Sequence, residues 1–150
     1  MKIQHWVDDD VVTTLGDISA KEAIIILHKR HIDSIVILDE DQKCEGMFTE
    51  RDAIRVVAND IPLTTPLAKV MTTNLQTISE HATYAMAKET MRIHNIRHLP
   101  VVDENGRFIG LINLGKMLDE IHEMHKIKRL KSLIKARRQY NEALRQQSYS

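Results

Sequence analysis

The chain of 150 residues is short of several residue types on which particular kinds of protein depend. Its one cysteine, Cys44, excludes an intramolecular disulfide and the usual cysteine zinc sites. Aromatic residues make up only 4% of the sequence, so Leu, Ile, Val and Met must fill the core. No apolar run approaches the length of a membrane span, and the polar N-terminus does not resemble a signal peptide. We therefore expect a soluble, cytoplasmic protein.

The chain also lacks net charge, but its charges are unevenly distributed. Residues 121–150 hold eight Lys and Arg against two Glu, a charge of +6, which leaves −6 for the remainder. Apolar residues recur in this region every three or four positions, which predicts an amphipathic helix. They are Met117, Ile121, Met124, Ile127, Leu130 and Ile134. We expect the tail to pack on the folded part or on a second copy of the chain; its basic face could instead contact nucleic acid or an acidic protein.

The first part of the chain predicts a strand, a helix, two strands and a second helix. Ser19 and Glu22 form a capping-box pattern ahead of an apolar segment, which marks a helix start. The β-branched run at 35–38 is too short for a helix and reads as a buried strand. The predicted elements are a strand at 11–14, a helix from Ser19 to about His31, strands at 35–38 and 44–48, and a helix from Thr49. Pro62 and Pro66 then prevent a regular helix across 59–66.

The same pattern occurs a second time. Shifted by 64 residues, positions 11–54 align with positions 75–118 without a gap, and the turns coincide. Gly46 aligns with Gly110, and Asp39 with Asp103. Each copy reads β-α-β-β-α and is too small to bury a core alone. We therefore predict an α+β fold in which two copies pack by their sheets around a pseudo-twofold axis.

The junction at 46–52, Gly-Met-Phe-Thr-Glu-Arg-Asp, places a hydroxyl and a carboxylate together at a helix N-terminus. Thr49 and Asp52 could simply form a capping box, in which each side chain bonds a backbone amide of the other. Alternatively, the carboxylate could accept hydrogen bonds from the vicinal hydroxyls of a ribose, with the helix N-terminus facing a phosphate. The spacing alone leaves both interpretations open.

The tandem unit resembles a pair of CBS domains, the regulatory modules named after cystathionine β-synthase. The resemblance rests on the Gly-apolar-apolar-Thr-x-x-Asp junction, on Arg-His-Leu-Pro-Val-Val-Asp at 97–103 and on Val-Met-Thr at 70–72. It implies a first repeat at 8–60, a linker at 61–70, a second repeat at 71–120 and a helical tail at 121–150. It also implies a binding module without catalysis, whose ligand contains adenosine, such as AMP, ADP, ATP, NAD(H) or S-adenosylmethionine.

Transferred residue by residue, the resemblance assigns one binding site. Thr49 and Asp52 would hold the ribose, Met47 would offer its backbone, and Arg97 and His98 would meet the phosphate. The remaining positions are Gln76, Thr77 and Ile78 beside the adenine, and Arg51 as an added cation or a solvated helix residue. In addition to this implied site, Met47, Phe48 and Ile78 are suitable apolar neighbours for a purine, although core packing also accounts for them.

The pseudo-symmetric site differs at both of its halves. The residues that align with Thr49 and Asp52 are Asn113 and Lys116, and those that align with Arg97 and His98 are Asp33 and Ser34. The ribose carboxylate has thus become a lysine, and the phosphate cations an acid and a hydroxyl. We predict one competent nucleotide site rather than two.

Other chemistry has little support in the sequence. His94 and His98 have helical metal spacing, but the repeat places His98 at the start of a strand, and no nucleophile with its base stands out. We therefore expect no enzyme activity, no metal and no tightly bound cofactor. The leading interpretation is an adenine-nucleotide sensor that works as a homodimer and regulates a partner. The rival is an interaction protein with an unused site, whose basic tail binds a protein or nucleic acid.

Overall fold

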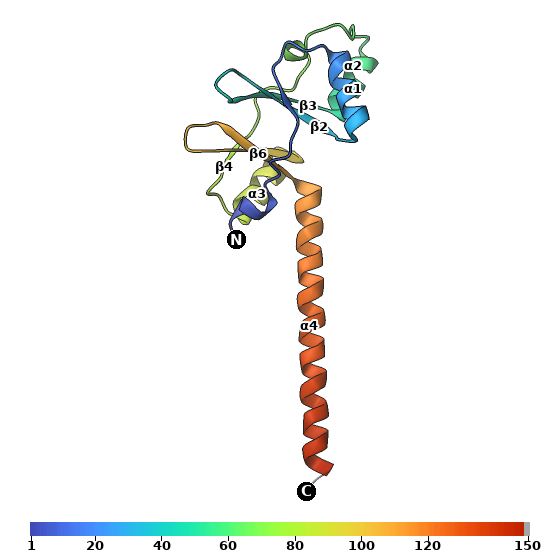
Figure 1. Ribbon diagram of the computed structural model, residues 1–150, viewed down its shortest axis with the longest axis vertical. Coiled ribbons are helices and arrows are strands. Elements are labelled where there is room, and N and C mark those ends of the chain that lie inside the picture. The colour runs from blue at the N-terminus through green and yellow to red at the C-terminus, as the bar shows by residue number, and fades with distance from the viewer. Residues whose placement is uncertain (149–150) are drawn as a thin grey trace. The chain divides into compact units, whose positions relative to one another are not determined.

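A computed structural model of the chain describes residues 1–148, so the last two residues of the predicted tail lie outside the described residues. The described chain forms two compact units, one from Met1 to Leu114 and a second that begins at Gly115. The first unit contains two three-stranded sheets, each with helices beside it, as the internal repeat predicted (Figure 1). Within residues 1–148, no helix combines the length and the apolar character needed to span a membrane.

The first sheet is built from β1 (Thr13–Thr14), β2 (Ser34–Leu38) and β3 (Cys44–Thr49) in that order. β1 and β2 run parallel because α1 (Ala20–Arg30) connects them, whereas β2 and β3 form an antiparallel hairpin. Ser19 caps α1 and accepts a hydrogen bond from the Glu22 amide at 3.1 Å, so the predicted helix start is confirmed. α2 (Glu50–Ala58) then begins directly after β3.

Both faces of β2 are buried, which explains its continuous apolar sequence. Ile35, Ile37 and Phe48 face α1 and α2, with which they form one core. Val36 and Met47 point the other way and pack with Leu111 of the second repeat. The sheets of the two repeats therefore pack against one another, as predicted.

The second repeat reproduces the first, with β4 (Ile78–Ser79), α3 (Tyr84–His94), β5 (His98–Val102) and β6 (Phe108–Asn113). The strand order β4-β5-β6 and the parallel and antiparallel pairings are the same. Even the helix ends agree: α1 and α3 both finish on a left-handed residue, His31 and Asn95, which are 64 positions apart. The predicted strand start at His98 is confirmed.

The repeat also extends further towards the N-terminus than its sequence pattern indicates. Residues 1–8 and 65–72, which we call the two leading segments, align under the same shift of 64, and each packs on the repeat that it does not lead into. In the first, Asp8 and Leu111 exchange backbone hydrogen bonds of 2.9 Å, and Ile3 donates to the Ala82 carbonyl. In the second, Thr72 and Met47 exchange bonds of 2.9 and 3.0 Å. The two repeats are therefore interlocked.

The first leading segment contains a short 3-10 helix, η1 (Ile3–Trp6), and the second contains η2 (Leu67–Lys69). Trp6 is buried and lies 5.3 Å from the ring of Tyr84, at the start of α3. In Figure 1 the N-terminal segment accordingly lies beside α3. Trp6 thus packs against α3 of the second repeat.

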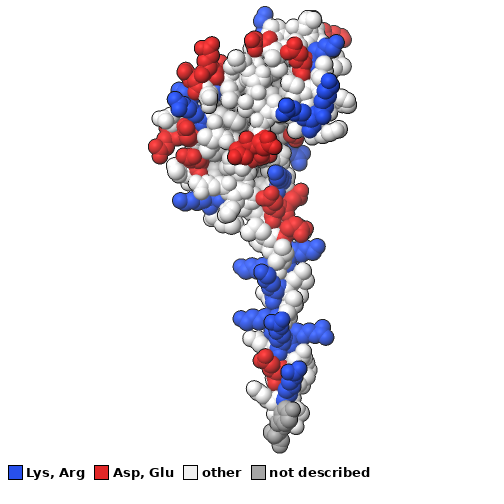
Figure 2. All heavy atoms as spheres, in the orientation of Figure 1, with Lys and Arg blue, Asp and Glu red and all other residues white. Residues whose placement is uncertain are grey.

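The last helix, α4 (Leu114–Ser148), joins the final helix of the second repeat and the predicted tail without interruption. Met117 is its buried residue, whereas about half of the surface of Met124, Ile127 and Ile134 is exposed. Figure 2 shows lysine and arginine side chains gathered along this helix. α4 is therefore a basic helix that carries an exposed apolar stripe.

Candidate functional site

The side chains of Thr49 and Asp52 form a complete capping box at the start of α2. The Thr49 amide donates to Asp52 Oδ2 at 2.9 Å, and the Asp52 amide donates to Thr49 Oγ1 at 3.4 Å. The Thr49 hydroxyl also lies 3.2 Å from Asp52 Oδ2. The structure therefore contains the capping box, which is one of the two interpretations of this junction. It does not exclude the second, because a capping carboxylate can still accept hydrogen bonds at its other oxygen.

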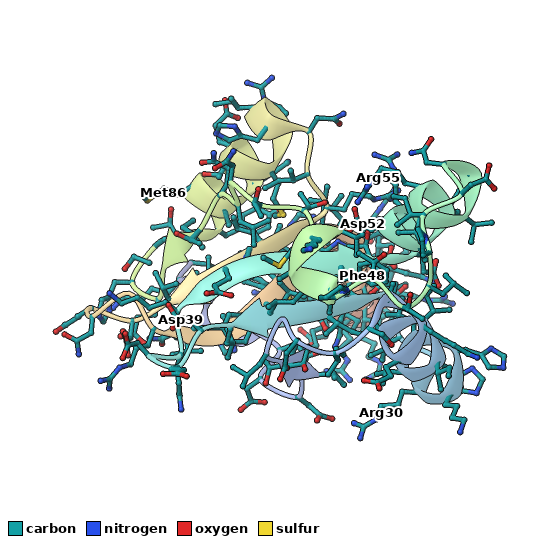
Figure 3. All side chains as sticks on the ribbon, turned by 90° about the horizontal axis from the view of Figure 1, so that it is seen from above. Arg30, Asp39, Phe48, Asp52, Arg55 and Met86 are labelled. Carbon is teal, nitrogen blue, oxygen red and sulfur yellow. The ribbon has the colours of Figure 1, made fainter. Side chains whose placement is uncertain are left out.

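That other oxygen, Asp52 Oδ1, already has two donors from the protein. The Thr72 hydroxyl donates to it at 2.8 Å, and Arg55 Nη2 lies 3.3 Å away. Arg55 also donates to the Val70 carbonyl, so it ties the start of α2 to the second leading segment. In Figure 3, Asp52 and Arg55 lie together beside the sheet that holds Phe48. Asp52 is only 6% exposed, and these bonds compensate for the desolvation of its charge.

Arg97 and His98 stand at the beginning of β5, beside the start of α4. The Arg97 carbonyl accepts from the Leu114 amide at 2.8 Å, and His98 Nε2 lies 3.5 Å from the Asn113 side-chain amide. His98 Nε2 also contacts Asp33 Oδ2 of the first repeat at 3.2 Å. The two residues expected at the phosphate thus lie next to Asn113 of their own repeat.

Asp33 connects the two groups of expected site residues, which are Thr49 with Asp52 and Arg97 with His98. Its side chain contacts His98, and its carbonyl accepts from the Glu50 amide at 3.1 Å, next to Thr49. Ser34 pairs with Thr49 across β2 and β3. Residues 33 and 34 align with 97 and 98, so the expected site and its pseudo-symmetric counterpart meet where β2 and β5 begin.

The remaining expected residues differ in exposure. Met47 is buried, and its backbone amide and carbonyl are both hydrogen-bonded to Thr72. The backbone groups that were expected to bind a ligand are therefore already paired within the protein. Ile78 is also buried and pairs with Val101 in the second sheet. Gln76 and Thr77 are exposed just before β4, and Arg51 is exposed in the first turn of α2.

Sequence reasoning did not anticipate Thr72, Arg55 and Asp33 as neighbours of this site. Arg55 could have been suspected, because it follows Asp52 by three positions on the same helix face. Thr72 belongs to the Val-Met-Thr segment that supported the family resemblance, but no sequence pattern predicted that its hydroxyl would bond Asp52. Asp33 had been considered only at the pseudo-symmetric site.

The candidates for other chemistry look inert. Burial raises the pKa of the Cys44 thiol to about 11, and a hydrogen bond with the Gly46 backbone offsets this only in part. The thiol is therefore protonated near neutral pH and not activated as a nucleophile. Among residues 1–148, no group of three or more His, Cys, Asp or Glu side chains is arranged to hold a metal ion.

A family model described as CBS domain matches residues 3–59 and again residues 67–123. The chain belongs to the CBS domain family. The two matched ranges are 64 positions apart and each includes six residues of one leading segment, 3–8 and 67–72, in agreement with the extended repeat. The suspected resemblance to a tandem CBS pair with a C-terminal helix is thereby confirmed.

Known proteins resemble the chain in sequence and in structure. Arabinose 5-phosphate isomerase GutQ of Shigella flexneri is 32% identical over 115 residues, which make up 75% of this chain but 36% of that protein. The chain thus spans about a third of the length of that relative.

Two solved CBS structures were obtained with adenosine compounds. The CBS pair of protein MJ0100, in complex with 5′-methylthioadenosine and S-adenosylmethionine, has a TM-score of 0.74 and 25% identity and covers 83% of this chain and 98% of its own. The CBS protein PAE2072 from Pyrobaculum aerophilum, complexed with AMP, has a TM-score of 0.70 and 25% identity, with 76% and 88% covered.

Proposed function

We propose that this CBS pair is a regulatory module that binds an adenosine-containing nucleotide reversibly, without catalysing a reaction. The observation that carries the proposal is the buried carboxylate of Asp52 at the N-terminus of α2, within the family's Thr-x-x-Asp junction. The adenosine compounds bound by two similar CBS structures support the class of ligand. Related CBS pairs were solved with different adenosine compounds, so we propose AMP, ADP, ATP, NAD(H) and S-adenosylmethionine as the ligands to test.

The proposed contacts follow from the chemistry of a nucleotide. A ribose presents two adjacent hydroxyls, and one carboxylate such as Asp52 can accept a hydrogen bond from each of them. The purine would lie near Met47 and the segment 76–78, and Arg51 would add a positive charge at the solvent-exposed edge of the proposed site. A phosphate would be bound by Arg97 and His98, since a guanidinium gives a bidentate contact and the imidazole ring can donate a further hydrogen bond.

The contact between His98 Nε2 and Asp33 Oδ2 has a consequence for this phosphate contact. The Asp33 side chain is 53% exposed, whereas that of His98 is 17% exposed, so the acid is the more accessible to solvent. A phosphate that approaches His98 would compete with the Asp33 carboxylate for the same nitrogen. Ligand binding would therefore loosen a contact between the two repeats, which provides a route from occupancy to the relative arrangement of the repeats.

Regulation requires that the nucleotide favour one arrangement of the protein over another. We propose that the chain works as a homodimer and that α4 carries the change to a partner or to the second copy. The exposed apolar stripe of α4 supports this role, because helices in proteins gain most of their stability when an apolar face packs against another surface. We further propose a cytoplasmic location.

The test is a panel of thermal unfolding measurements on the full chain with AMP, ADP, ATP, NADH and S-adenosylmethionine. A ligand at 100 times its Kd should stabilise the protein by about 2.7 kcal/mol, a shift of several degrees. Asp52→Asn should abolish the shift while keeping an oxygen for the cap. Lys116→Met, at the aligned position of the second repeat, is the matched control and should retain the shift. No shift with any nucleotide, in a folded sample, would refute the proposal.

One observation favours the rival function, an interaction protein with an unused site. Both oxygens of Asp52 are already hydrogen-bonded within the chain, so the capping role alone accounts for this residue. The rival predicts indifference to nucleotides and a salt-sensitive association through the basic helix α4 with a protein or nucleic acid. Removing residues 121–150 would abolish that association.

A further inference from the structure

The two oxygens of Asp52 are held by donors of different kinds. Oδ2 accepts from the amide and the hydroxyl of Thr49, three residues away, as part of the helix cap. Oδ1 accepts from the Thr72 hydroxyl, twenty residues away in the second leading segment, and from Arg55. A carboxylate offers about four acceptor positions, two on each oxygen. The protein itself therefore fills the acceptor positions of Asp52.

The donors to Oδ1 are also the ones nearest to solvent. Asp52 is 6% exposed, whereas Thr72 is an exposed residue and the side chain of Arg55 is 43% exposed. A polyhydroxyl ligand that approaches from solvent thus meets Thr72 and Arg55 before it can reach the carboxylate. The bonds to Thr49 lie within the cap and can stay in place throughout.

We propose that Thr72 and Arg55 compete with the hydroxyls of a ribose for Asp52 Oδ1 and thereby set the affinity of the nucleotide site. This inference rests on the proposed function, since it assigns an affinity-determining role within that same site. A ribose hydroxyl that binds Oδ1 must replace a donor that is already there. The exchange is one hydrogen bond for another, so the net gain is smaller than at a carboxylate with a free acceptor position.

The structure allows this exchange without disrupting the fold. The backbone of Thr72 remains fixed by its two hydrogen bonds with Met47, so only its hydroxyl has to rotate away. Arg55 retains its bond to the Val70 carbonyl when it leaves Asp52. Because the Thr72 hydroxyl connects the second leading segment to Asp52 of α2, its release would remove one side-chain link between that segment and the first repeat.

The decisive variant is Thr72→Val, which removes the hydroxyl but keeps the shape and the β-branched backbone preference. The affinity of the full chain for AMP and for ATP would be measured by titration calorimetry. We expect T72V to bind about tenfold more tightly than the wild type, since one competing hydrogen bond to a charged group is removed. Thr73→Val, at the neighbouring exposed position, is the matched control and should leave the affinity unchanged.

The outcomes separate this inference from the proposed function. Tighter binding by T72V supports the competition, because a merely structural defect would weaken binding. Equal or weaker binding by T72V, together with wild-type binding that Asp52→Asn abolishes, overturns the competition and leaves the nucleotide site standing. Binding by neither the wild type nor T72V overturns both. If T72V does not fold, Arg55→Met removes the other competing donor and must tighten binding instead.

Discussion

Gly46 is the residue at which a single methyl group should test the interlocked arrangement of the two repeats. A Cβ at this position would lie 2.6 Å from Met71 Sδ and 2.8 Å from the Thr72 carbonyl oxygen. The Met71 side chain could rotate away. The Thr72 carbonyl cannot move freely, because it accepts from the Met47 amide while the Thr72 amide donates back. Gly46→Ala must therefore push the second leading segment off β3.

The magnitude follows from the contacts that this displacement disturbs. Two backbone hydrogen bonds contribute about 1 kcal/mol each, and overpacking a filled site costs about 1–3 kcal/mol. The lower entropy of the unfolded alanine chain offsets about 0.5–1 kcal/mol. We expect G46A to lose about 2–4.5 kcal/mol of unfolding free energy, which corresponds to a decrease in Tm of roughly 10 °C.

The assay is urea unfolding followed by the fluorescence of Trp6, the only tryptophan. Gly110→Ala should show a loss of similar size, because its Cβ would contact Val7 and the Asp8 carbonyl in the pseudo-symmetric position. Gly106→Ala is the control: its nearest neighbour lies at 4.0 Å, so only its positive φ of 78° carries a cost, about 1 kcal/mol. A G46A protein within about 0.5 kcal/mol of the wild type would refute the close crossing of the leading segment.

Two further predictions concern the first leading segment and the cysteine. Trp6→Ala should destabilise the protein by about 3 kcal/mol, because it leaves a cavity beside Tyr84. Urea unfolding followed by circular dichroism measures this loss. A loss below about 1 kcal/mol would mean that residues 1–8 contribute little to the fold. Cys44, with a pKa of about 11, should react with a thiol reagent at pH 8 about a hundredfold more slowly than a free cysteine, and rapid labelling would contradict its burial. Because the unfolded thiol ionises near pH 8.5, the contribution of this group to stability should be complete below that pH and decrease as the pH rises towards about 11.

Local signals in the sequence were sufficient for the elements and for their repetition. The Ser19 cap, the Thr49–Asp52 box and the β-branched run of β2 depend on residues within a few positions of one another, and the structure contains all three. The register of 64 residues then predicted two sheets that pack together, because each copy has more apolar surface than it can bury alone. The continuous apolar run of β2 already implied that both of its faces are covered.

The partners of Asp52 and the course of the leading segments were decided only by the tertiary structure. Thr72 lies twenty residues from Asp52, and Ile3 bonds the carbonyl of Ala82 in the far repeat. Neither contact leaves a periodic or capping pattern, since each depends on where a whole segment crosses a sheet. The sequence therefore determined the candidate side chains of the proposed nucleotide site, and the crossing of the second leading segment decided which protein donors bond the Asp52 carboxylate.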